Sequence, residues 1–373
     1  MIRILHIVGR MDRAGAETMI MNLYRVLDRT RFQFDFLYFT DDRCDFDDEI
    51  ESLGGRTYRL PMSRYRNPIS RMFALKRLLM DNRHLQIIHC HTLFSNAFHL
   101  WAGQMAGIKF RIAHSHNTSD LSKGRLLSKT YHALSKHLMK LKATHFMACG
   151  EEAGRFLFPG INKVQLFPNS IDTLSFAETA RDNRDYLRKM LNLPKDVLVI
   201  IQIGRLREVK NHQFAIGMAA YMERCGIKFH LVFAGDGHLR KDLEALALDY
   251  RLEEKITFLG VRADIPLLLA GADLMLMPSL HEGFPVVLIE SQAAGKPALI
   301  ADTISREVDL GVGLVDFESL AQPYEVWRNK LQRLIYQPRL GDQERLKILR
   351  DRGFDIHQSI QQLEQIYSDL GKV

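Results

Sequence analysis

Short apolar runs alternate with segments of helical apolar spacing along almost the whole chain. The runs have the length and composition of buried strands, and the segments between them place apolar residues at i, i+3 and i+4. The strands expected in the first half span residues 2–8, 34–39, 57–60, 86–91, 111–116, 145–149 and 164–167. A second series spans residues 197–203, 230–234, 256–259, 274–277 and 298–301. This alternation predicts an α/β protein with parallel sheets covered by helices.

The two series of strands predict two doubly wound, Rossmann-like domains with a ligand-binding cleft between the carboxyl ends of their strands. A chain of 373 residues is long enough for both. Residues 173–196 are polar and weakly patterned, which favours a linker. We therefore expect domains at 1–175 and 176–355, followed by a helix at 356–373. The pattern does not decide whether that helix packs back on the first domain.

Composition places the chain among ordinary globular proteins, with 46% hydrophobic and 25% charged residues. Its four cysteines are widely separated and lack metal-binding spacing, which indicates reduced thiols and a cytoplasmic location. The N-terminal apolar run is too short for a signal peptide and predicts a first strand. Residues 84–108 contain no Asp, Glu, Lys or Arg, but their His, Asn and Gln residues favour a buried strand and helix over a membrane span.

The net charge of +7 is concentrated in the first half of the chain. Residues 56–145 contain sixteen Lys or Arg but only two acids, Asp81 and Asp120. Such a surface attracts anionic surfaces, although a solvated basic face without a partner explains the same charges equally well. Recognition helices and zinc-finger spacing are missing from the sequence, so nucleic acid is not an expected partner.

Residues 278–297 predict a strand-to-helix turn that is suited to an anion. Free N–H groups and the positive end of the helix dipole point out of such a turn, and Gly283 permits close approach to the backbone. At the rise of an α-helix, Glu282 and Glu290 are expected to lie about 12 Å apart along the helix axis and within a quarter turn of each other. Carboxylates that far apart could each hold a diol on either side of a diphosphate. A single glutamate in such a place is more often a surface residue.

A basic loop follows the first strand of the second series, with Arg205 and Lys210 in the sequence Gly-Arg-Leu-Arg-Glu-Val-Lys. Two cations on such a loop could neutralise a leaving diphosphate without a metal ion. A solvated basic loop is the simpler alternative.

Histidine pairs end two neighbouring strands, at His89 and His91 and at His114 and His116. Ligand sites of α/β proteins lie at such strand ends. Packing and zinc binding are the alternatives, although no carboxylate or cysteine completes a tetrahedral set. The D-x-D sequence at Asp45 and Asp47 opens an acidic helix start, where carboxylates suit the dipole without binding metal.

The string Glu-Gly-Phe-Pro, followed by four residues and a second Glu, resembles the E-x7-E signature of family-4 type retaining glycosyltransferases of GT-B fold. The resemblance implies that Glu282 contacts the donor sugar and that Glu290 binds the ribose hydroxyls. It implies that the backbone at Gly283, Phe284 and Pro285 holds sugar and phosphate. It also makes Arg205 and Lys210 the diphosphate clamp, the first domain the acceptor domain and the second the nucleotide-sugar domain.

The same resemblance covers nearly the whole chain and implies further contacts. His116 falls where the family has a histidine that touches the donor, and His91 falls on the acceptor side. Gly15 matches the family's glycine-rich loop, with Ala14 in place of its first glycine. Gly235 matches tight backbone near the nucleotide, and Val261 and Arg262 match the strand end that contacts the base. The final helix of the family packs back on the first domain.

The expected reaction is transfer of a hexose from a nucleotide diphosphate sugar, most readily a UDP-sugar, with retention and without a metal or other cofactor. A sugar-nucleotide epimerase or hydrolase on the same fold is one alternative. A non-catalytic module that binds nucleotide sugars is the other.

The residues around His91 and His116 further resemble the branch of the family that assembles bacterial capsule and exopolysaccharide. There the acceptor is a glycan on a polyprenyl diphosphate. The basic first domain suits an anionic membrane, so peripheral attachment to the inner face of the cell membrane is a further expectation.

Overall fold

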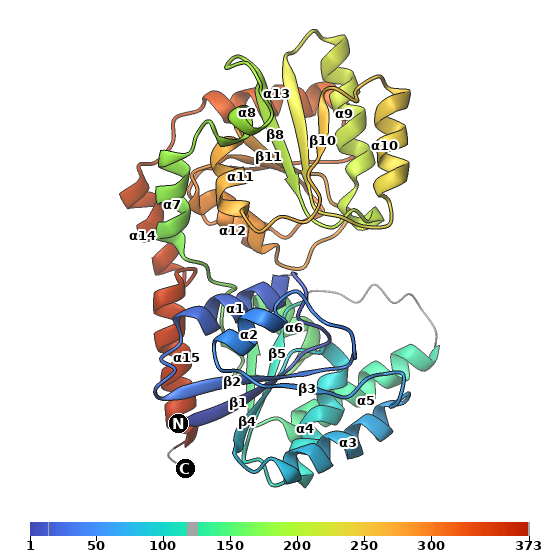
Figure 1. Ribbon diagram of the computed structural model, residues 1–373, viewed down its shortest axis with the longest axis vertical. Helices are drawn as coiled ribbons and strands as arrows, with labels where there is room; N and C mark the ends of the chain where they lie inside the picture. The colour runs from blue at the N-terminus through green and yellow to red at the C-terminus, as the bar shows by residue number, and fades with distance from the viewer. Residues whose placement is uncertain (14, 118–125, 372–373) are drawn as a thin grey trace. The chain divides into compact units, whose positions relative to one another are not determined.

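A computed structural model describes residues 1–13, 15–117 and 126–371 (Figure 1). The chain divides into two units, which are described separately. The first comprises Met1–Ile171 and Asp355–Val373, and the second comprises Asp172–Phe354. Ala14, at the departure from the family's glycine-rich loop, and Asp120 lie outside the described residues.

The first unit contains a seven-stranded parallel sheet in the order β3-β2-β1-β4-β5-β6-β7. Its strands are β1 (Ile2–Ile7), β2 (Phe32–Tyr38), β3 (Thr57–Arg59), β4 (Leu85–Cys90), β5 (Phe110–Ser115), β6 (His145–Ala148) and β7 (Gln165–Leu166). Because β1 lies beside both β2 and β4, the sheet is wound in both directions from its centre. The loops that follow β1, β4 and β5 therefore meet at one edge.

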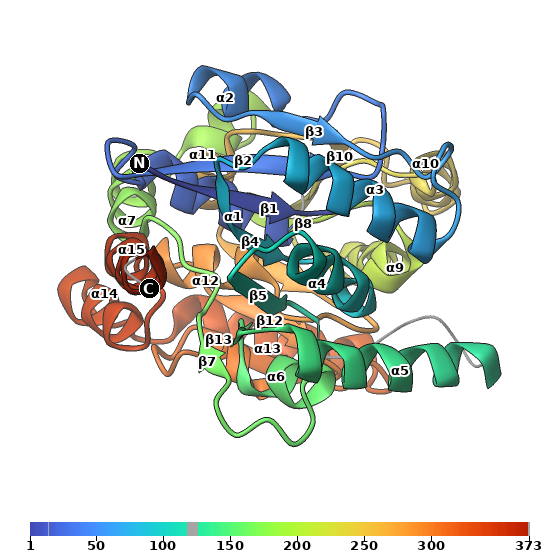
Figure 2. The same cartoon turned by 90° about the horizontal axis from the view of Figure 1, so that it is seen from below.

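Helices cover both faces of this sheet. They are α1 (Gly15–Val26), α2 (Asp47–Ser52), α3 (Pro68–Asp81), η1 (Leu93–Ser95), α4 (Asn96–Met105), α5 (Leu126–Lys142), α6 (Glu151–Leu157) and α15 (Ile356–Gly371). Helix α4 packs against α3 and α5, and these three lie side by side in Figure 2. Helix α3 begins where Asn67 accepts a hydrogen bond from the Ser70 N–H and Pro68 takes the first turn.

The final helix, α15, belongs to the first unit. It packs against α1, and its buried face contributes Ile360, Leu363 and Tyr367 to the core beneath β1 and β2. The chain re-enters the unit where the Ile356 N–H donates to the Ile171 carbonyl at 2.9 Å. Burial of this apolar stripe explains why a segment far away in sequence completes the first unit.

The second unit contains a six-stranded parallel sheet in the order β10-β9-β8-β11-β12-β13. Its strands are β8 (Leu198–Ile203), β9 (Phe229–Ala234), β10 (Ile256–Phe258), β11 (Leu274–Met277), β12 (Ala298–Ala301) and β13 (Val315–Glu318). Its helices are α7 (Thr173–Asp182), α8 (Tyr186–Met190), η2 (Glu208–Lys210), α9 (His212–Arg224), α10 (Arg240–Asp249), α11 (Ile265–Gly271), α12 (Val286–Ala293), η3 (Arg306–Val308), α13 (Tyr324–Tyr336) and α14 (Asp342–Asp351). Strand β13 has no counterpart in the sequence prediction, because its acidic residues interrupt the apolar run.

The stretch expected to be a linker is folded instead. Helices α7 and α8 occupy most of residues 173–196, and both pack against α11. Asp172 caps α7 by accepting the Ser175 N–H at 2.9 Å, and Arg188 of α8 pairs with Asp273. Short helices with one narrow buried stripe give little periodicity, so a polar composition was mistaken for an extended connection.

Two parallel-sheet, Rossmann-like domains confirm the predicted α/β fold class. No helix in the described part of the chain combines the length and hydrophobicity that crossing a membrane would require.

Candidate active site

Hydrogen bonds join the loops that follow β8 and β11 in the second unit. These strands are parallel neighbours, so their carboxyl ends lie side by side. The Leu280 N–H donates to the Val209 carbonyl at 2.8 Å, and the Asn211 side chain donates to the Pro278 carbonyl at 3.0 Å. The basic loop and the Glu282 turn are therefore joined into one surface at the strand ends.

Lys210 and Glu282 face each other across this junction. The Lys210 Nζ lies 2.7 Å from the Glu282 Oε1, and the two side chains are only 19% and 12% exposed. Gln202 of β8 donates to the Lys210 carbonyl at 2.7 Å and holds the backbone of the loop. The structure therefore brings together Lys210, which is predicted to bind the diphosphate, and Glu282, which is predicted to bind the donor sugar.

Gly204 gives the Lys210 side chain its path to Glu282. A Cβ at Gly204 would lie 3.0 Å from the Lys210 Cε, and the Gly204 φ angle of +150° disfavours other residues. Gly235 is equally constrained, because its Cβ would meet the Gly204 carbonyl at 2.0 Å. The Gly235 N–H also donates to the Gly260 carbonyl at 2.8 Å. The tight backbone expected at Gly235 thus results from packing of the β8, β9 and β10 ends.

Arg205 lies in the same loop but is exposed. Its guanidinium makes no hydrogen bond or ion pair with the residues that the structure describes. The geometry therefore leaves Arg205 available to an external anion, while its role in the clamp stays a prediction.

Only residues 286–293 of the predicted turn-and-helix segment are α-helical, as α12. Glu282 precedes the helix, so the separation of about 12 Å along a common helix axis is wrong as a description of this pair. Pro285 is the residue before the helix, and Phe284 stacks on Phe354 with ring centroids 5.6 Å apart. Phe284 can therefore present only its backbone to a ligand at the start of α12.

Glu290 lies on α12 and is half-buried. Burial raises the pKa of its carboxyl group from an ordinary 4.5 to about 7. Hydrogen-bond donors such as ribose hydroxyl groups would stabilise the ionised form, so the geometry and chemistry suit the predicted role.

The two expected base contacts differ in environment. Val261 is 62% exposed just beyond β10, where an apolar surface is open to a ligand. The Arg262 guanidinium binds both carboxylate oxygens of Asp264, at 2.7 and 2.6 Å, and Asp264 also accepts the Tyr186 hydroxyl. Arg262 is therefore committed to Asp264, and contact of its side chain with a base stays a prediction.

A histidine cluster occupies the carboxyl ends of β1, β4 and β5 in the first unit, and we define it as His6, His89, His91, His114 and His116. His6 Nδ1 lies 3.0 Å from His91 Nε2, and His91 Nδ1 lies 2.8 Å from His116 Nε2. In a second branch, His89 Nε2 lies 3.1 Å from His114 Nδ1, while His89 Nδ1 lies 2.8 Å from the Tyr367 hydroxyl.

The members share one face because residues two apart in a strand point the same way. His89 and His91 stack with ring centroids 4.3 Å apart. Sequence analysis missed His6 and Tyr367. His6 is the register partner of His89, which only the strand order reveals.

Burial keeps the histidine cluster neutral. It lowers the pKa of His6 to about 3 and that of His116 to about 4, although Asn169 opposes the shift at His116. It lowers the pKa of His89, His91 and His114 as well. In each hydrogen bond between two histidines of the cluster, one ring therefore donates its N–H and the other accepts it.

Gly15 begins α1, and a Cβ built on it would have no atom of the described residues within 4 Å. The start of α1 is therefore open to a ligand, as close approach to a phosphate requires, and the contact itself stays a prediction.

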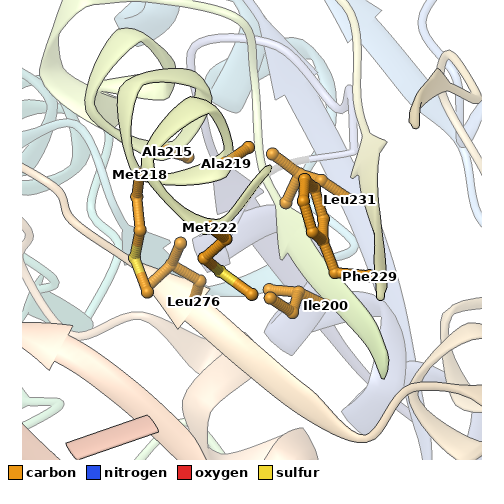
Figure 3. A pocket seen from close by; sticks show the side chains of 8 residues that line it. All are labelled: Ile200, Ala215, Met218, Ala219, Met222, Phe229, Leu231 and Leu276. Atoms are coloured by element: carbon orange, nitrogen blue, oxygen red, sulfur yellow. The ribbon is translucent and has the colours of Figure 1, made fainter. Parts of the chain in front are cut away.

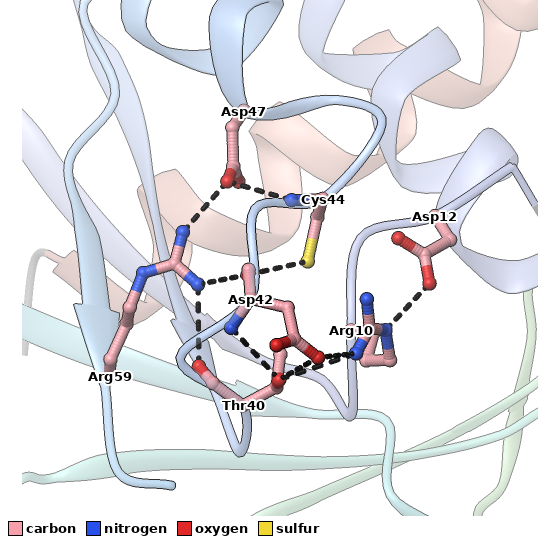
Figure 4. Close-up of polar contacts among 7 residues, drawn as sticks. All are labelled: Arg10, Asp12, Thr40, Asp42, Cys44, Asp47 and Arg59. Atoms are coloured by element: carbon pink, nitrogen blue, oxygen red, sulfur yellow. Dashed lines mark hydrogen bonds and ion pairs between the residues drawn. The ribbon is translucent and has the colours of Figure 1, made fainter.

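The two aspartates of the D-x-D sequence make contacts within the first unit. Asp47 accepts the Cys44 N–H at 2.9 Å and pairs with Arg59 at 2.7 Å (Figure 4). Asp45 accepts the Arg13 N–H at 3.0 Å. These contacts fasten the loop after β2 and leave Asp47 engaged with a cation.

An apolar cavity lies between α9 and the sheet of the second unit (Figure 3). Its lining is formed by Ile200, Ala215, Met218, Ala219, Met222, Phe229, Leu231 and Leu276. A volume of about 10 Å³ leaves room for at most one water molecule. This cavity is a gap in the core and not a donor site.

Two Rossmann-like domains, one of which joins a basic loop to a glutamate turn at its strand ends, define the GT-B class of glycosyltransferase folds. Residues 13–174 match the family described as Glycosyltransferase Family 4, and residues 183–308 match glycosyl transferases group 1. The chain is 38% identical to the putative glycosyltransferase EpsF of Bacillus subtilis, over 98% of this chain and 96% of the relative. The chain therefore belongs to the family 4 glycosyltransferases, which confirms the resemblance drawn from its motifs.

A second relative is named for capsular polysaccharide biosynthesis. The capsular polysaccharide biosynthesis glycosyltransferase CapH of Staphylococcus aureus is 24% identical over 98% of this chain and 99% of its own. Among solved structures, Anabaena Alr3699/HepE in complex with UDP and glucose has a TM-score of 0.79 at 18% identity, covering 99% of this chain and 100% of that one. At that identity the similarity concerns the fold.

Proposed function

We propose that this glycosyltransferase moves a hexose from a UDP-sugar to a glycan or lipid-linked acceptor, with retention, in surface polysaccharide synthesis. The observation that carries the proposal is the Lys210–Glu282 pair, held by loops that are hydrogen-bonded to each other at the β8 and β11 ends. Support comes from an Escherichia coli relative named as a UDP-Gal:α-D-GlcNAc-diphosphoundecaprenol α-1,3-galactosyltransferase, which is 27% identical over 62% of this chain and 61% of its own.

The pair suggests how the donor is held. The Lys210 ammonium group pairs with the Glu282 carboxylate. A bound donor would offer its diphosphate to Lys210 and its sugar hydroxyl groups to Glu282. Lys210 would then exchange a carboxylate for phosphate oxygens, and Glu282 would exchange an ammonium group for hydroxyl hydrogen-bond donors. The exposed Arg205 would supply a second cation, and Glu290 would take the ribose.

The step that breaks the bond places negative charge on the leaving diphosphate. Lys210, Arg205 and the N–H groups at the start of α12 would stabilise that charge without a metal ion or another cofactor. One such donor is worth about 2.7–4 kcal/mol in the transition state. Glu282 positions the sugar in this scheme. The acceptor hydroxyl attacks the face that the diphosphate leaves, and its proton passes to the leaving phosphate.

The first unit would bind the acceptor near an anionic membrane. Ile69, Phe73 and Met80 are exposed on α3, and Arg66 and Arg77 are exposed beside them. Leu134 and Leu141 are exposed on the basic helix α5. Apolar side chains among basic ones suit insertion into an anionic leaflet, which would place the enzyme on the inner face of the cell membrane.

Flotation with vesicles tests that location. The wild type should float with phosphatidylglycerol vesicles and stay behind with phosphatidylcholine alone. The double variant Ile69→Ser/Phe73→Ser should lose flotation, while Leu248→Ser, which changes an exposed leucine of the second unit, should keep it. Equal flotation of the wild type with both lipids would refute the proposed attraction of the first unit to anionic lipid.

A donor screen tests the reaction. Thermal shift across nucleotide sugars identifies the donor, because a ligand that binds the folded state raises the melting temperature. Product analysis with donor alone and with acceptor, in the presence of EDTA, then separates transfer from epimerisation, hydrolysis and binding without turnover. The anomeric configuration of the product reports retention directly.

Two matched variants probe the clamp. Arg205→Ala should lower turnover by about 10²–10³-fold with little change in acceptor KM. Arg207→Ala removes an exposed arginine from the same loop and should have a small effect. Similar turnover in both variants would remove Arg205 from the mechanism.

A further inference from the structure

The histidine cluster contains more chemistry than the proposed reaction uses. The family resemblance gives expected roles to only two of the cluster's five members, His116 and His91. His114 and His89 are fully buried imidazoles beside them, with ring nitrogens directed into the same cluster. Buried polar side chains in such density need a physical account.

Three of these rings can reach one ion. One ring nitrogen from each of His91, His114 and His116 lies within 4.8 Å of the others. Two imidazoles on a tetrahedral zinc ion have their ligand nitrogens about 3.3 Å apart, given Zn–N distances of about 2.0–2.1 Å. His91 Nδ1 and His116 Nε2 lie 2.8 Å apart. A small opening, with the shared proton moved to the other nitrogen of the ring that carries it, would leave both of these nitrogens able to bind a metal ion.

His114 has a free nitrogen for this purpose. Its Nδ1 faces His89, and its Nε2 is buried without a hydrogen-bond partner among the described residues. His89 is held in turn by the Tyr367 hydroxyl at 2.8 Å. His89 thus contacts the nitrogen of His114 that would not bind the ion, and in known metal sites a partner at that nitrogen orients the ligating imidazole.

A second set, His6, His89 and His91, satisfies the same distance condition. Its His6 and His89 are 1% and 2% exposed, whereas His91 and His116 are half-buried. An ion can therefore reach the set with His116 more easily. Ligands made only of imidazole select late first-row ions such as Zn²⁺, Co²⁺, Ni²⁺ or Cu²⁺ over Mg²⁺ or Ca²⁺.

We propose that His91, His114 and His116 form a three-histidine site for Zn²⁺ or a chemically similar ion, with the fourth position open to water or an anion. The ion is an inhibitor and not a cofactor, because it occupies the nitrogens of His91 and His116. This consequence for activity rests on the proposed function, whereas binding does not.

Metal titration tests binding without any assay of activity. Zn²⁺ should compete for a chromophoric chelator, and Co²⁺ should give the intense visible absorption of a tetrahedral site. His114→Asn keeps an amide near the Nδ1 position toward His89 but removes Nε2. Loss of a residue that only orients a metal ligand already weakens metal binding about 10- to 100-fold. Loss of the ligand itself should therefore weaken Zn²⁺ binding by more than about tenfold. His137→Gln, which changes an exposed histidine of α5, should bind like the wild type.

Other outcomes would overturn the site. Binding that survives in His114→Asn but disappears in His6→Asn would move the ion to the other set. Loss in His137→Gln would indicate surface binding. Circular dichroism and melting curves of every variant separate loss of a ligand from loss of the fold.

Activity is the second arm. Zn²⁺ should inhibit transfer by the wild type and by His137→Gln, EDTA should restore it, and the residual turnover of His114→Asn should be insensitive. If the protein binds Zn²⁺ as expected but transfers no sugar, the proposed function fails and the site stands. If transfer proceeds and Zn²⁺ neither binds nor inhibits, the site fails alone.

Discussion

Replacing Gly204 by alanine tests whether the position of Lys210 controls turnover. The new Cβ would lie 3.0 Å from the Lys210 Cε and 3.3 Å from its Nζ, closer than side chains normally pack. Lys210 must therefore move away from its path toward Glu282. A misplacement of about 1 Å in a catalytic group costs on the order of 10²-fold. Because this contact displaces the Lys210 side chain by only a few tenths of an ångström, we expect turnover to fall by about 2- to 10-fold.

The same change strains the backbone, since the φ angle of Gly204 is +150°. Strain of this kind costs about 1–3 kcal/mol. Gly226→Ala is the matched control, because Gly226 also has a positive φ, +68°, but a Cβ there would touch nothing within 4 Å. Gly226→Ala should lower the melting temperature and leave turnover unchanged.

Steady-state kinetics with the identified donor measure the effect, and a double variant decides its origin. If Gly204 acts through Lys210, Gly204→Ala/Lys210→Met should be no slower than Lys210→Met alone, because neighbouring residues with one shared effect are not additive. Full turnover in Gly204→Ala, or simple multiplication of the two losses, would refute the reasoning.

Three further predictions concern the same unit. Glu290→Gln should change how stability depends on pH. Between about pH 4.5 and 7 the folded wild type keeps a proton on Glu290 that the unfolded chain releases, so its free energy of unfolding falls by up to about 3 kcal/mol as pH rises. Urea titrations across this range should show no such fall in the variant. Gly235→Ala would place a Cβ 2.0 Å from the Gly204 carbonyl, so its melting temperature should drop further than that of an alanine at an unobstructed glycine, and an equal drop would contradict the packing. Asn211→Ala loses the hydrogen bond to Pro278 and leaves a non-glycine residue at a φ of +53°, so it should cost about 1–2 kcal/mol and raise the donor KM; an unchanged KM would show that this bond does not position the site.

The sequence alone determined the fold class and the places of the candidate site residues within it. The apolar runs at Leu274–Met277 and Ala298–Ala301 were predicted with their observed bounds. An apolar run reports burial of its own segment, and parallel sheets concentrate ligand sites at strand ends. Arg205, Lys210, Glu282 and the histidine pairs could therefore be found at or just beyond the carboxyl ends of these runs.

Only the tertiary structure decided which of these residues meet. Lys210 and Glu282 pair because β8 lies next to β11, and no local pattern encodes that adjacency. For the same reason the sequence missed the role of His6 beside His89 and of Tyr367, which a helix near the end of the chain brings to the first unit. Burial, which sets the pKa of Glu290, is likewise a property of the assembled core. Periodicity describes one element at a time, whereas contacts, charge pairs and desolvation arise between elements.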